Sequence, residues 1–259
     1  MAEPILPPWP DLWIAAGRAS LPLSLRVKRW SGGRTFVAQL QDPRLPPSLF
    51  DLVIPPRHDG LTGPNVVPIL GAPHRVTHDT LARGWADFAA ALEPLPRPRV
   101  AVLIGGKSKA HDLSPARAQS MARQVAAAIE AGGGSLMLTF SRRTPAAAKA
   151  AFRAALGALP GQIWDGDGPN PYFGFLAFAD HILVTEDSAN MATEAAATGA
   201  PVQVLAMDGD SRKLAAFHGE LARHGASRSF AGRLESWSYE PLAETERAAR
   251  AVVEAMERR

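Results

Sequence analysis

Short apolar runs alternate with longer stretches of helical periodicity from residue 99 onward. Val100 to Ile104 is a continuous apolar run, typical of a strand buried on both faces. Ser114 to Ala131 follows as a helix, with Pro115 in its first turn. The series continues with residues 135–140, 145–156, 162–164, 172–179, 181–185, 188–198 and 202–205. This alternation predicts a parallel, doubly wound α/β sheet, in which ligands bind beyond the carboxyl ends of the strands.

The first third of the chain has strand-like runs with shorter connections. Strands are predicted at residues 12–16, 35–41, 50–54 and 65–70, and a helix is predicted at residues 80–92. Residues 20–30 fit either a strand, by alternation, or a helix that begins at Ser20 and Pro22. The proline cluster at residues 94, 96 and 98 suggests a domain boundary. We therefore expect a small N-terminal α/β domain over residues 1–93 and a Rossmann-like domain over residues 94–259.

Four polar or glycine-rich loops follow strands of the second domain and should meet at one rim. They are Gly105-Gly106, Ser141-Arg142-Arg143, residues 166–171 and Thr185-Glu186-Asp187. Lys107 after the glycines suggests a phosphate loop, but Ala101 stands where that loop requires glycine. The glycine turn either admits a ligand to the backbone or is a plain tight turn.

A helix that starts after Ser188 and stops at Gly199 and Pro201 offers a place for an anion. Unpaired amides and the helix dipole favour a phosphate above Asp187, Ser188 and Asn190. Glu194 shares a face with Asn190 and lies roughly 9 Å along the axis from Ser188. A diphosphate can therefore meet the first turn while a ribose meets Glu194.

Other residues of the rim are candidates for the same ligand. One of Arg142 and Arg143 can clamp a diphosphate, because a guanidinium matches phosphate oxygens. Asn170 and Tyr172 can lie against a nucleobase, although a proline turn with Tyr172 in the core explains the sequence nearly as well. We also assign Glu186 and Met191, which flank the helix start, to the donor site.

Composition narrows the class of protein. The chain has no cysteine, 46% apolar residues and a formal charge of +3 carried mostly by arginine. Disulfides and thiol catalysis are excluded, and a cytoplasmic protein without a signal peptide or membrane span is expected. Arg26, Lys28 and Arg29 beside Trp30 can touch an anionic inner membrane surface, or they can form a solvated helix face. Nucleic acid is not an expected partner.

Metal is not expected either. The Asp-Gly-Asp triplets at residues 165–167 and 208–210 fall in turn-like sequence, where such residues are ordinary. An EF-hand begun at Asp165 would need glutamate where Leu176 stands. No zinc pattern is present.

The spacing Glu194-Ala195-x-x-x-Gly199-x-Pro201 resembles the donor motif of B-type glycosyltransferases, in which two Rossmann-like domains face a cleft. More closely, the chain resembles the family named after a plant mitochondrial-fission factor, whose bacterial members are usually described as glycosyltransferases. The matching pieces are residues 51–60, 63–76, 102–106, 141–145, 168–180 and 184–205.

The resemblance implies that Glu194 binds ribose hydroxyls and that the helix before it binds the diphosphate. It favours a helix at residues 20–30, and it implies that the last helix, residues 242–256, crosses back to the first domain. Family members usually carry a further strand, helix and strand before the segment near Leu12, so the first domain is abbreviated. A lone His-Asp pair is more often structural, but the resemblance supports His58, oriented by Asp59, as the catalytic base. His111, after the glycine loop, is a weaker candidate.

The expected activity is transfer from a UDP- or GDP-linked sugar to a glycan or lipid acceptor, such as a cell-envelope component, without metal or cofactor. Two alternatives remain open from the sequence: a non-catalytic adaptor that keeps the fold, and a nucleotide-sugar epimerase.

Overall fold

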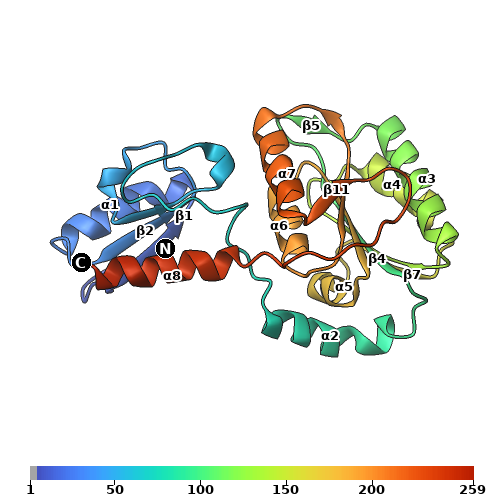
Figure 1. Ribbon diagram of the computed structural model, residues 1–259, viewed down its shortest axis with the longest axis horizontal. Coiled ribbons are helices and arrows are strands. Elements are labelled where there is room, and N and C mark those ends of the chain that lie inside the picture. Colours follow the sequence, from blue (N-terminus) through green and yellow to red (C-terminus); the bar gives the residue numbers. More distant parts are fainter. Residues whose placement is uncertain (1–4) are drawn as a thin grey trace. The chain divides into compact units, whose positions relative to one another are not determined.

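The computed structural model describes residues 5–259 as two compact units (Figure 1). Unit 1 comprises the chain up to Pro73 together with Ala243–Arg259, and unit 2 comprises His74–Leu242. The first four residues of the expected N-terminal domain lie outside the described part. Both units are α/β and each is built on a parallel sheet, as the sequence predicts.

Unit 1 is built on a three-stranded parallel sheet in the order β1-β2-β3. Its elements are β1 (Leu12–Ala16), η1 (Arg18–Ser20), α1 (Leu21–Trp30), β2 (Phe36–Leu40), η2 (Pro47–Leu49), β3 (Leu52–Ile54), η3 (Arg57–Asp59) and α8 (Glu244–Glu257). The apolar stripe of α8, with Ala248 and Val252, packs on Phe36, Ile54 and other core residues of this sheet. The last helix of the chain is therefore part of the first unit.

The segment 65–70 is not the strand that its apolar pattern predicts. It makes only two isolated bridges, Val53 with Val66 and Pro56 with Ile69. Pro68 has no N–H to donate to a ladder, which explains why pairing is not continuous through this run. The ambiguous segment before β2 is a helix, α1.

Unit 2 contains a six-stranded sheet in the order β11-β9-β8-β4-β6-β7, parallel throughout. Its strands are β4 (Arg99–Ile104), β6 (Ser135–Phe140), β7 (Gly161–Trp164), β8 (His181–Thr185), β9 (Val202–Leu205) and β11 (Ser227–Ser229), with the short pair β5 (His111–Asp112) and β10 (Asp208–Gly209). Its helices are α2 (His78–Leu92), α3 (Pro115–Ala131), α4 (Ala146–Leu156), α5 (Tyr172–Phe178), α6 (Ala189–Ala196) and α7 (Arg212–His224). From β4 the chain adds strands first on one side and then, with β8, on the other. The strand order therefore reverses between β4 and β8.

Helix α2 belongs to unit 2, so the division lies at Pro73–His74 and not after residue 93. Gly84 of α2 lies so close to α5 that an added Cβ would be 2.6 Å from the carbonyl carbon of Phe173. In return, a Cβ on Gly174 would lie 2.8 Å from the ring of Phe88. Two glycines thus let α2 and α5 pack with their backbones in contact. The proline cluster at residues 94, 96 and 98 lies between α2 and β4, so it connects two elements of unit 2.

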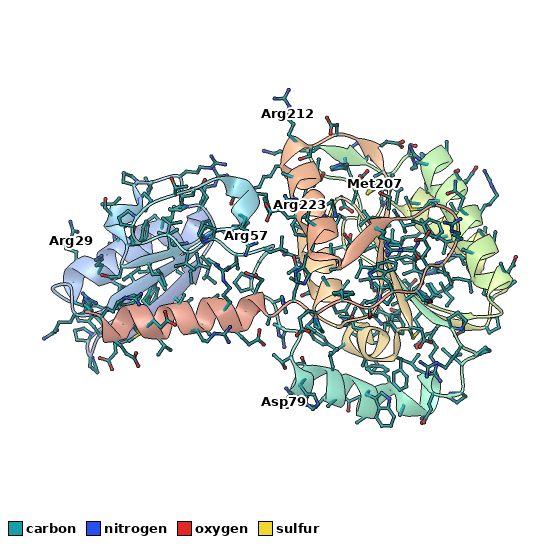
Figure 2. All side chains as sticks on the ribbon, viewed as in Figure 1. Arg29, Arg57, Asp79, Met207, Arg212 and Arg223 are labelled. Atoms are coloured by element: carbon teal, nitrogen blue, oxygen red, sulfur yellow. The ribbon has the colours of Figure 1, made fainter. Side chains whose placement is uncertain are left out.

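The cationic face of α1 is largely solvated. Lys28 Nζ lies 3.2 Å from Asp51 Oδ1, whereas Arg26 and Arg29 are exposed. Figure 2 shows the side chain of Arg29 extended into solvent. Trp30 is 45% exposed and stacks on Trp9. Among the described residues, none of the helices combines the length and the apolar character needed to span a bilayer. Contact with a membrane surface stays a prediction.

Candidate functional site

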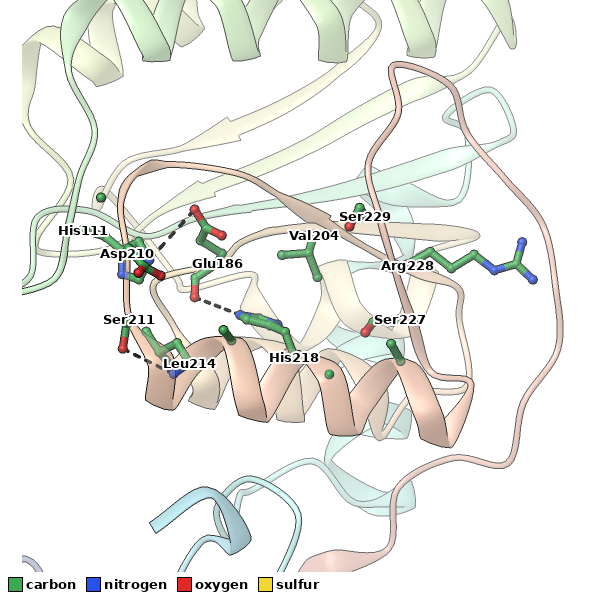
Figure 3. A pocket seen from close by; sticks show the side chains of 14 residues that line it. His111, Glu186, Val204, Asp210, Ser211, Leu214, His218, Ser227, Arg228 and Ser229 are labelled. Carbon is green, nitrogen blue, oxygen red and sulfur yellow. Dashed lines mark hydrogen bonds and ion pairs between the residues drawn. The ribbon is translucent and has the colours of Figure 1, made fainter. Parts of the chain in front are cut away.

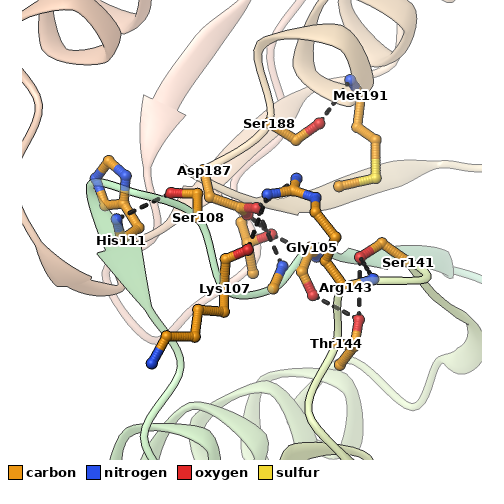
Figure 4. Close-up of polar contacts among 12 residues, drawn as sticks. Gly105, Lys107, Ser108, His111, Ser141, Arg143, Thr144, Asp187, Ser188 and Met191 are labelled. Atoms are coloured by element: carbon orange, nitrogen blue, oxygen red, sulfur yellow. Dashed lines mark hydrogen bonds and ion pairs between the residues drawn. The ribbon is translucent and has the colours of Figure 1, made fainter.

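The loops after β4 and β8 meet at the point where the strand order reverses (Figure 4). The Gly105 N–H donates to Thr185 Oγ1 at 2.7 Å, and that hydroxyl donates to Asp187 Oδ1 at 2.8 Å. The Gly106 N–H donates to Asp187 Oδ2 at 3.0 Å. Open parallel sheets bind ligands at this topological position, and the hydrogen bonds make it a fixed corner.

Arg143, from the loop after β6, completes the corner. Its Nη2 lies 2.9 Å from Asp187 Oδ2, and the Asp187 side chain is fully buried while that of Arg143 is 46% exposed. Arg143 Nη1 also donates to the Lys107 carbonyl at 3.3 Å. Asp187 therefore neutralises and positions Arg143, whose exposed half still faces solvent. The neighbouring Arg142 is exposed.

Gly105 and Gly106 are required by packing inside the protein. A Cβ on Gly105 would lie 2.0 Å from Asp187 Oδ1, and one on Gly106 would lie 2.1 Å from the Arg143 carbonyl oxygen. The space beside these glycines holds protein atoms, whereas the sequence left open a ligand approaching the backbone. The absence of a side chain at Gly105 and Gly106 therefore leaves room for Asp187 and for the backbone of Arg143.

Ser188 caps α6, as its sequence context predicts. Its Oγ accepts a hydrogen bond from the Met191 N–H at 3.3 Å, while Asn190 in the first turn is exposed. The leading amides of a helix have no partner within the helix, so this end can receive an anion. Ser141 is used locally, since its Oγ accepts from the Arg143 N–H at 3.1 Å and keeps that loop turned back.

Glu194 lies farther along α6 and accepts a hydrogen bond from the Tyr172 hydroxyl. The Asn170 side-chain oxygen accepts from the Tyr172 N–H at 3.0 Å and fixes the start of α5. Burial raises the pKa of Glu194, against the opposing effects of Tyr172 and of the Arg75 charge. Burial, together with the Glu194 charge, raises the pKa of Tyr172 well above its ordinary value. The structure thus brings Asn170, Tyr172 and Glu194 together, with one Glu194 oxygen already engaged.

Glu186 serves a different part of unit 2. Its side-chain Oε1 accepts from the Met207 N–H and lies 3.9 Å from His111 Nε2. Its backbone carbonyl accepts from His218 Nε2 at 2.9 Å. None of these contacts is to the corner around Asp187.

His58 and Asp59 lie on the 3-10 helix η3 of unit 1, immediately after Pro56. The donor-site candidates all lie in unit 2. The assignment of His58 as a base, oriented by Asp59, stays a prediction.

Two threonines of the corner were not among the candidate ligand-binding residues, although Thr185 was expected in one of the rim loops. Thr185 links Gly105 to Asp187, and Thr144 Oγ1 donates to the Ile104 carbonyl at 3.1 Å. Thr185 ends strand β8 and Thr144 precedes helix α4, and a polar residue at such a position was the sequence feature that could have identified them. The described residues contain no group of three or more His, Asp or Glu side chains arranged to hold a metal ion.

Solved structures with this fold include nucleotide-sugar enzymes. UDP-GlcNAc 2-epimerase from Methanocaldococcus jannaschii superposes with a TM-score of 0.57 at 14% identity, over 96% of this chain and 69% of that one. UDP-GlcNAc 2-epimerase from Neisseria meningitidis bound to UDP-GlcNAc gives a TM-score of 0.52 at 13% identity, over 96% and 70% of the two chains. At these identities the likeness shows the fold alone.

Sequence relatives are more similar. The mitochondrial fission protein ELM1 of Arabidopsis thaliana is 35% identical over 93% of this chain, which spans 62% of the length of that relative. The uncharacterized protein RP120 of Rickettsia prowazekii is 28% identical over 93% of this chain and 78% of that protein. The sequence profile described as Mitochondrial fission ELM1 matches residues 1–256. The chain therefore belongs to the mitochondrial fission ELM1 family.

Proposed function

We propose that unit 2 binds a nucleoside diphosphate sugar and that the protein transfers the sugar to an acceptor, as a glycosyltransferase. The observation that carries the proposal is the corner at the strand-order reversal. There an anchored arginine and the start of a capped helix come from the loops that follow β6 and β8, the strands on either side of β4.

The diphosphate would lie over the first turn of α6, accepting from the amides of residues 188–190 and from Arg143. Arg143 suits this role because Asp187 already holds one side of its guanidinium, which limits the entropy lost when phosphate binds. Arg142 is a second, unanchored cation at the same loop. The fixed donors would stabilise charge on the departing nucleoside diphosphate, so the leaving step needs no metal in this proposal.

The nucleoside would extend along α6 toward Glu194. A carboxylate can accept hydrogen bonds from both hydroxyls of a ribose. One Glu194 oxygen already accepts from Tyr172, so the other oxygen would accept from the ribose first. Tyr172 and Asn170 then border the position of the base. On the acceptor side, we retain His58 with Asp59 as the proposed base, from the family resemblance.

A nucleotide-sugar epimerase is the second candidate, because the fold matches above are to UDP-GlcNAc 2-epimerases. A binding or adaptor role is the third, because the Arabidopsis relative is named for mitochondrial fission and not for an enzyme. All three candidates keep a nucleotide-sugar binding site, at least in part. They differ in whether the bound nucleotide sugar reacts and in which reaction it undergoes.

The test incubates the purified chain with UDP-, GDP-, CMP- and ADP-sugars, with and without a mixed glycan and lipid acceptor fraction. Release of nucleotide that requires the acceptor supports transfer, whereas a changed sugar on the intact nucleotide supports epimerisation. Binding without turnover supports the adaptor. Absence of binding to every nucleotide in calorimetry and thermal shift contradicts the donor site itself.

Within this test, Arg143→Ala is compared with Arg142→Ala. The anchored Arg143 should contribute more, and its loss is expected to weaken UDP or GDP binding by about 1.5–3 kcal/mol, the range for a hydrogen bond to a charged group. Equal UDP or GDP affinity in both variants and in the wild type would show that the Arg143 guanidinium does not bind the nucleotide.

A further inference from the structure

Strand β1 is an open edge of the unit 1 sheet. On its inner side it lies beside β2 and pairs with it from Leu12 to Ala16 (Figure 1). The opposite edge of the sheet, at β3, is covered by the segment 65–70 through two bridges. In the part of the chain that the structure describes, no strand pairs with the outer side of β1. One row of backbone groups in unit 1 is therefore left without a partner strand.

The direction of the backbone groups in β1 follows from one hydrogen bond. The Phe36 N–H donates to the Asp11 carbonyl at 2.8 Å, so the groups of residue 11 face β2. The N–H and C=O of a strand residue point to the same side, and successive residues alternate between the two sides. The odd-numbered residues of β1 therefore face β2, and residues 12, 14 and 16 face the open edge. Within the described chain, the one partner of these outward groups is Ser20, whose hydroxyl donates to the Ala16 carbonyl at 3.1 Å.

The open edge lacks the features that normally protect an edge strand. Such strands usually carry charged residues, proline or a bulge. In unit 2, the edge strand β11 has the polar sequence Ser-Arg-Ser, and the Arg228 side chain extends from it (Figure 3). Strand β1 has the sequence Leu-Trp-Ile-Ala-Ala in unbroken register with β2, and its Ile14 side chain is 53% exposed. An apolar, unprotected edge of this kind is a site for another strand.

We propose that this strand comes from a second copy of the chain, so that two β1 strands pair antiparallel about a two-fold axis at Ile14. In an antiparallel pair, a residue with outward groups can lie opposite its own copy and exchange both hydrogen bonds with it. Ile14 is the central outward residue, and placing it on the axis sets Leu12 opposite Ala16 of the second copy. The Ala16 carbonyl has a second lone pair with which to accept. Every outward group of the edge then meets a donor or an acceptor.

The charges at the two ends of β1 favour the same arrangement. Asp11 precedes the strand and Arg18 follows it, and both residues are exposed. Antiparallel pairing brings the acidic end of one strand to the basic end of the other, whereas parallel pairing would bring like charges together. The edge is thus complementary to itself in charge as well as in hydrogen bonds.

Apolar side chains stand beside the proposed axis. Leu12 packs in the core that α8 covers, so the side chains of residues 12, 14 and 16 lie on the α8 face of the sheet. Ala251 of α8 lines a hollow with Val67, which pairs beyond β3. Val253 is 54% exposed and lies two residues farther on, about half a turn around the helix, on the flank toward β1. In the dimer both α8 helices lie on one face of the joined sheet, with the two Ile14 side chains between them.

Sedimentation equilibrium of the full chain over roughly 1–200 μM tests the proposal. We expect a reversible equilibrium between monomer and dimer with no larger species, because a two-fold pairing occupies the edge of both copies. A monomer throughout the range, or assembly beyond the dimer, overturns the proposal. The test concerns unit 1 alone and is independent of the nucleotide-sugar site proposed in unit 2.

Amide exchange measured by NMR at low and high protein concentration locates the contact in the wild type. The outward amides of Leu12, Ile14 and Ala16 should exchange more slowly at high concentration, because the second copy then accepts from them. The amides of Trp13 and Ala15 already face β2 and should not change. Equal changes in both sets, or no change in either, contradict the pairing.

Charge variants test the position of the axis. Ile14→Lys puts like charges opposite each other and should weaken the dimer about tenfold or more. Leu49→Lys is the matched control, because it makes the same change at a 41% exposed leucine of unit 1 outside β1. An equimolar mixture of Ile14→Lys and Ile14→Glu should dimerise again, since opposite charges then face each other. A folded mixture that stays monomeric, or an Ile14→Lys dimer as strong as that of the wild type, contradicts an axis at Ile14.

Proline variants test the direction of the backbone groups. Ile14→Pro removes an outward N–H, a position at which an edge strand tolerates proline, so unit 1 should stay folded while the dimer weakens about tenfold or more. Ala15→Pro removes an N–H that faces β2 and should instead destabilise unit 1. Circular dichroism with urea unfolding separates the two effects. Equal destabilisation by both substitutions, or an unchanged dimer in Ile14→Pro, overturns the proposed pairing.

Discussion

Asp187 and Arg143 form an ion pair with a 2.9 Å contact, in which the carboxylate is wholly buried and the guanidinium is half exposed. The same carboxylate accepts from Thr185 and from the Gly106 amide. Loops that are far apart in the chain are thereby joined through one side chain. The position of Arg143 depends on Asp187 in the way that the position of a catalytic side chain depends on its supporting groups.

Asp187→Asn should destabilise the folded state by about 1–3 kcal/mol, since a neutral amide replaces the charged acceptor of three hydrogen bonds. The exposure of Arg143 keeps the cost below that of breaking a fully buried ion pair. Urea unfolding followed by circular dichroism measures the change. Asp112→Asn is the control, because its pair with Lys107 is exposed to solvent and should contribute little to stability. Similar losses in both variants would contradict a special role for Asp187.

Gly105→Ala and Gly219→Ala should have opposite effects. At Gly105 the new Cβ would lie 2.0 Å from Asp187 Oδ1, so the corner must shift, at a cost of roughly 1–3 kcal/mol by analogy with overpacking. At Gly219, inside α7, the Cβ meets nothing within 4 Å, and helix propensity should add about 0.5–1 kcal/mol. Thermal and urea unfolding of the two variants check the prediction, and a stable Gly105→Ala protein would show that the corner is not tightly packed.

The stability contribution of Glu194 should fall as pH rises. Burial raises the pKa of this carboxyl in the folded state, so the folded chain binds its proton more tightly than the unfolded chain does. The contribution therefore declines from about pH 4.3 up to the raised pKa. We expect the wild type and Glu194→Gln to have similar melting temperatures at the acidic end of this window. At higher pH the Glu194→Gln variant should melt at the higher temperature. Tyr172→Phe removes a hydrogen bond that lowers the pKa of Glu194. In this variant the stability contribution of Glu194 should therefore decline over a range that extends to higher pH.

Residues 74–242 should fold when produced alone, because they form one continuous unit with its own sheet and core. Residues 5–73 alone should not, since Ala248 and Val252 of α8 complete their core. Amide dispersion in NMR spectra of the two fragments measures this. A well-dispersed spectrum for the shorter fragment would mean that α8 adds little to unit 1.

Much of unit 2 could be predicted from local pattern. Continuous apolar runs define β4, β6 and β8, and Ser114 and Ser188 cap the helices that they precede. The convergence of the loops after these strands followed from the rule for parallel sheets, and Gly105, Arg143 and Asp187 do meet. Local signals suffice here because each element is bounded by residues that determine its own ends.

Other features depended on distant contacts or carried local signals that were overlooked. The pairing of Arg143 with Asp187, 44 residues apart, depends on the strand order, which periodicity does not encode. Helix α7 was missed although Ser211 caps it and Gly225 ends it in the left-handed conformation. Strand β11 has the polar sequence Ser-Arg-Ser and pairs with β9 at the sheet edge, so no apolar alternation marks it.

The membership of α8 in unit 1 has a consequence for synthesis. The ribosome completes residues 74–242 before it makes Ala243–Arg259, so unit 2 can acquire its structure while translation is still under way. Unit 1, although its strands emerge first, must wait for the last helix to leave the exit tunnel. During that interval Phe36, Ile54 and their neighbours lack their cover and are available to chaperones.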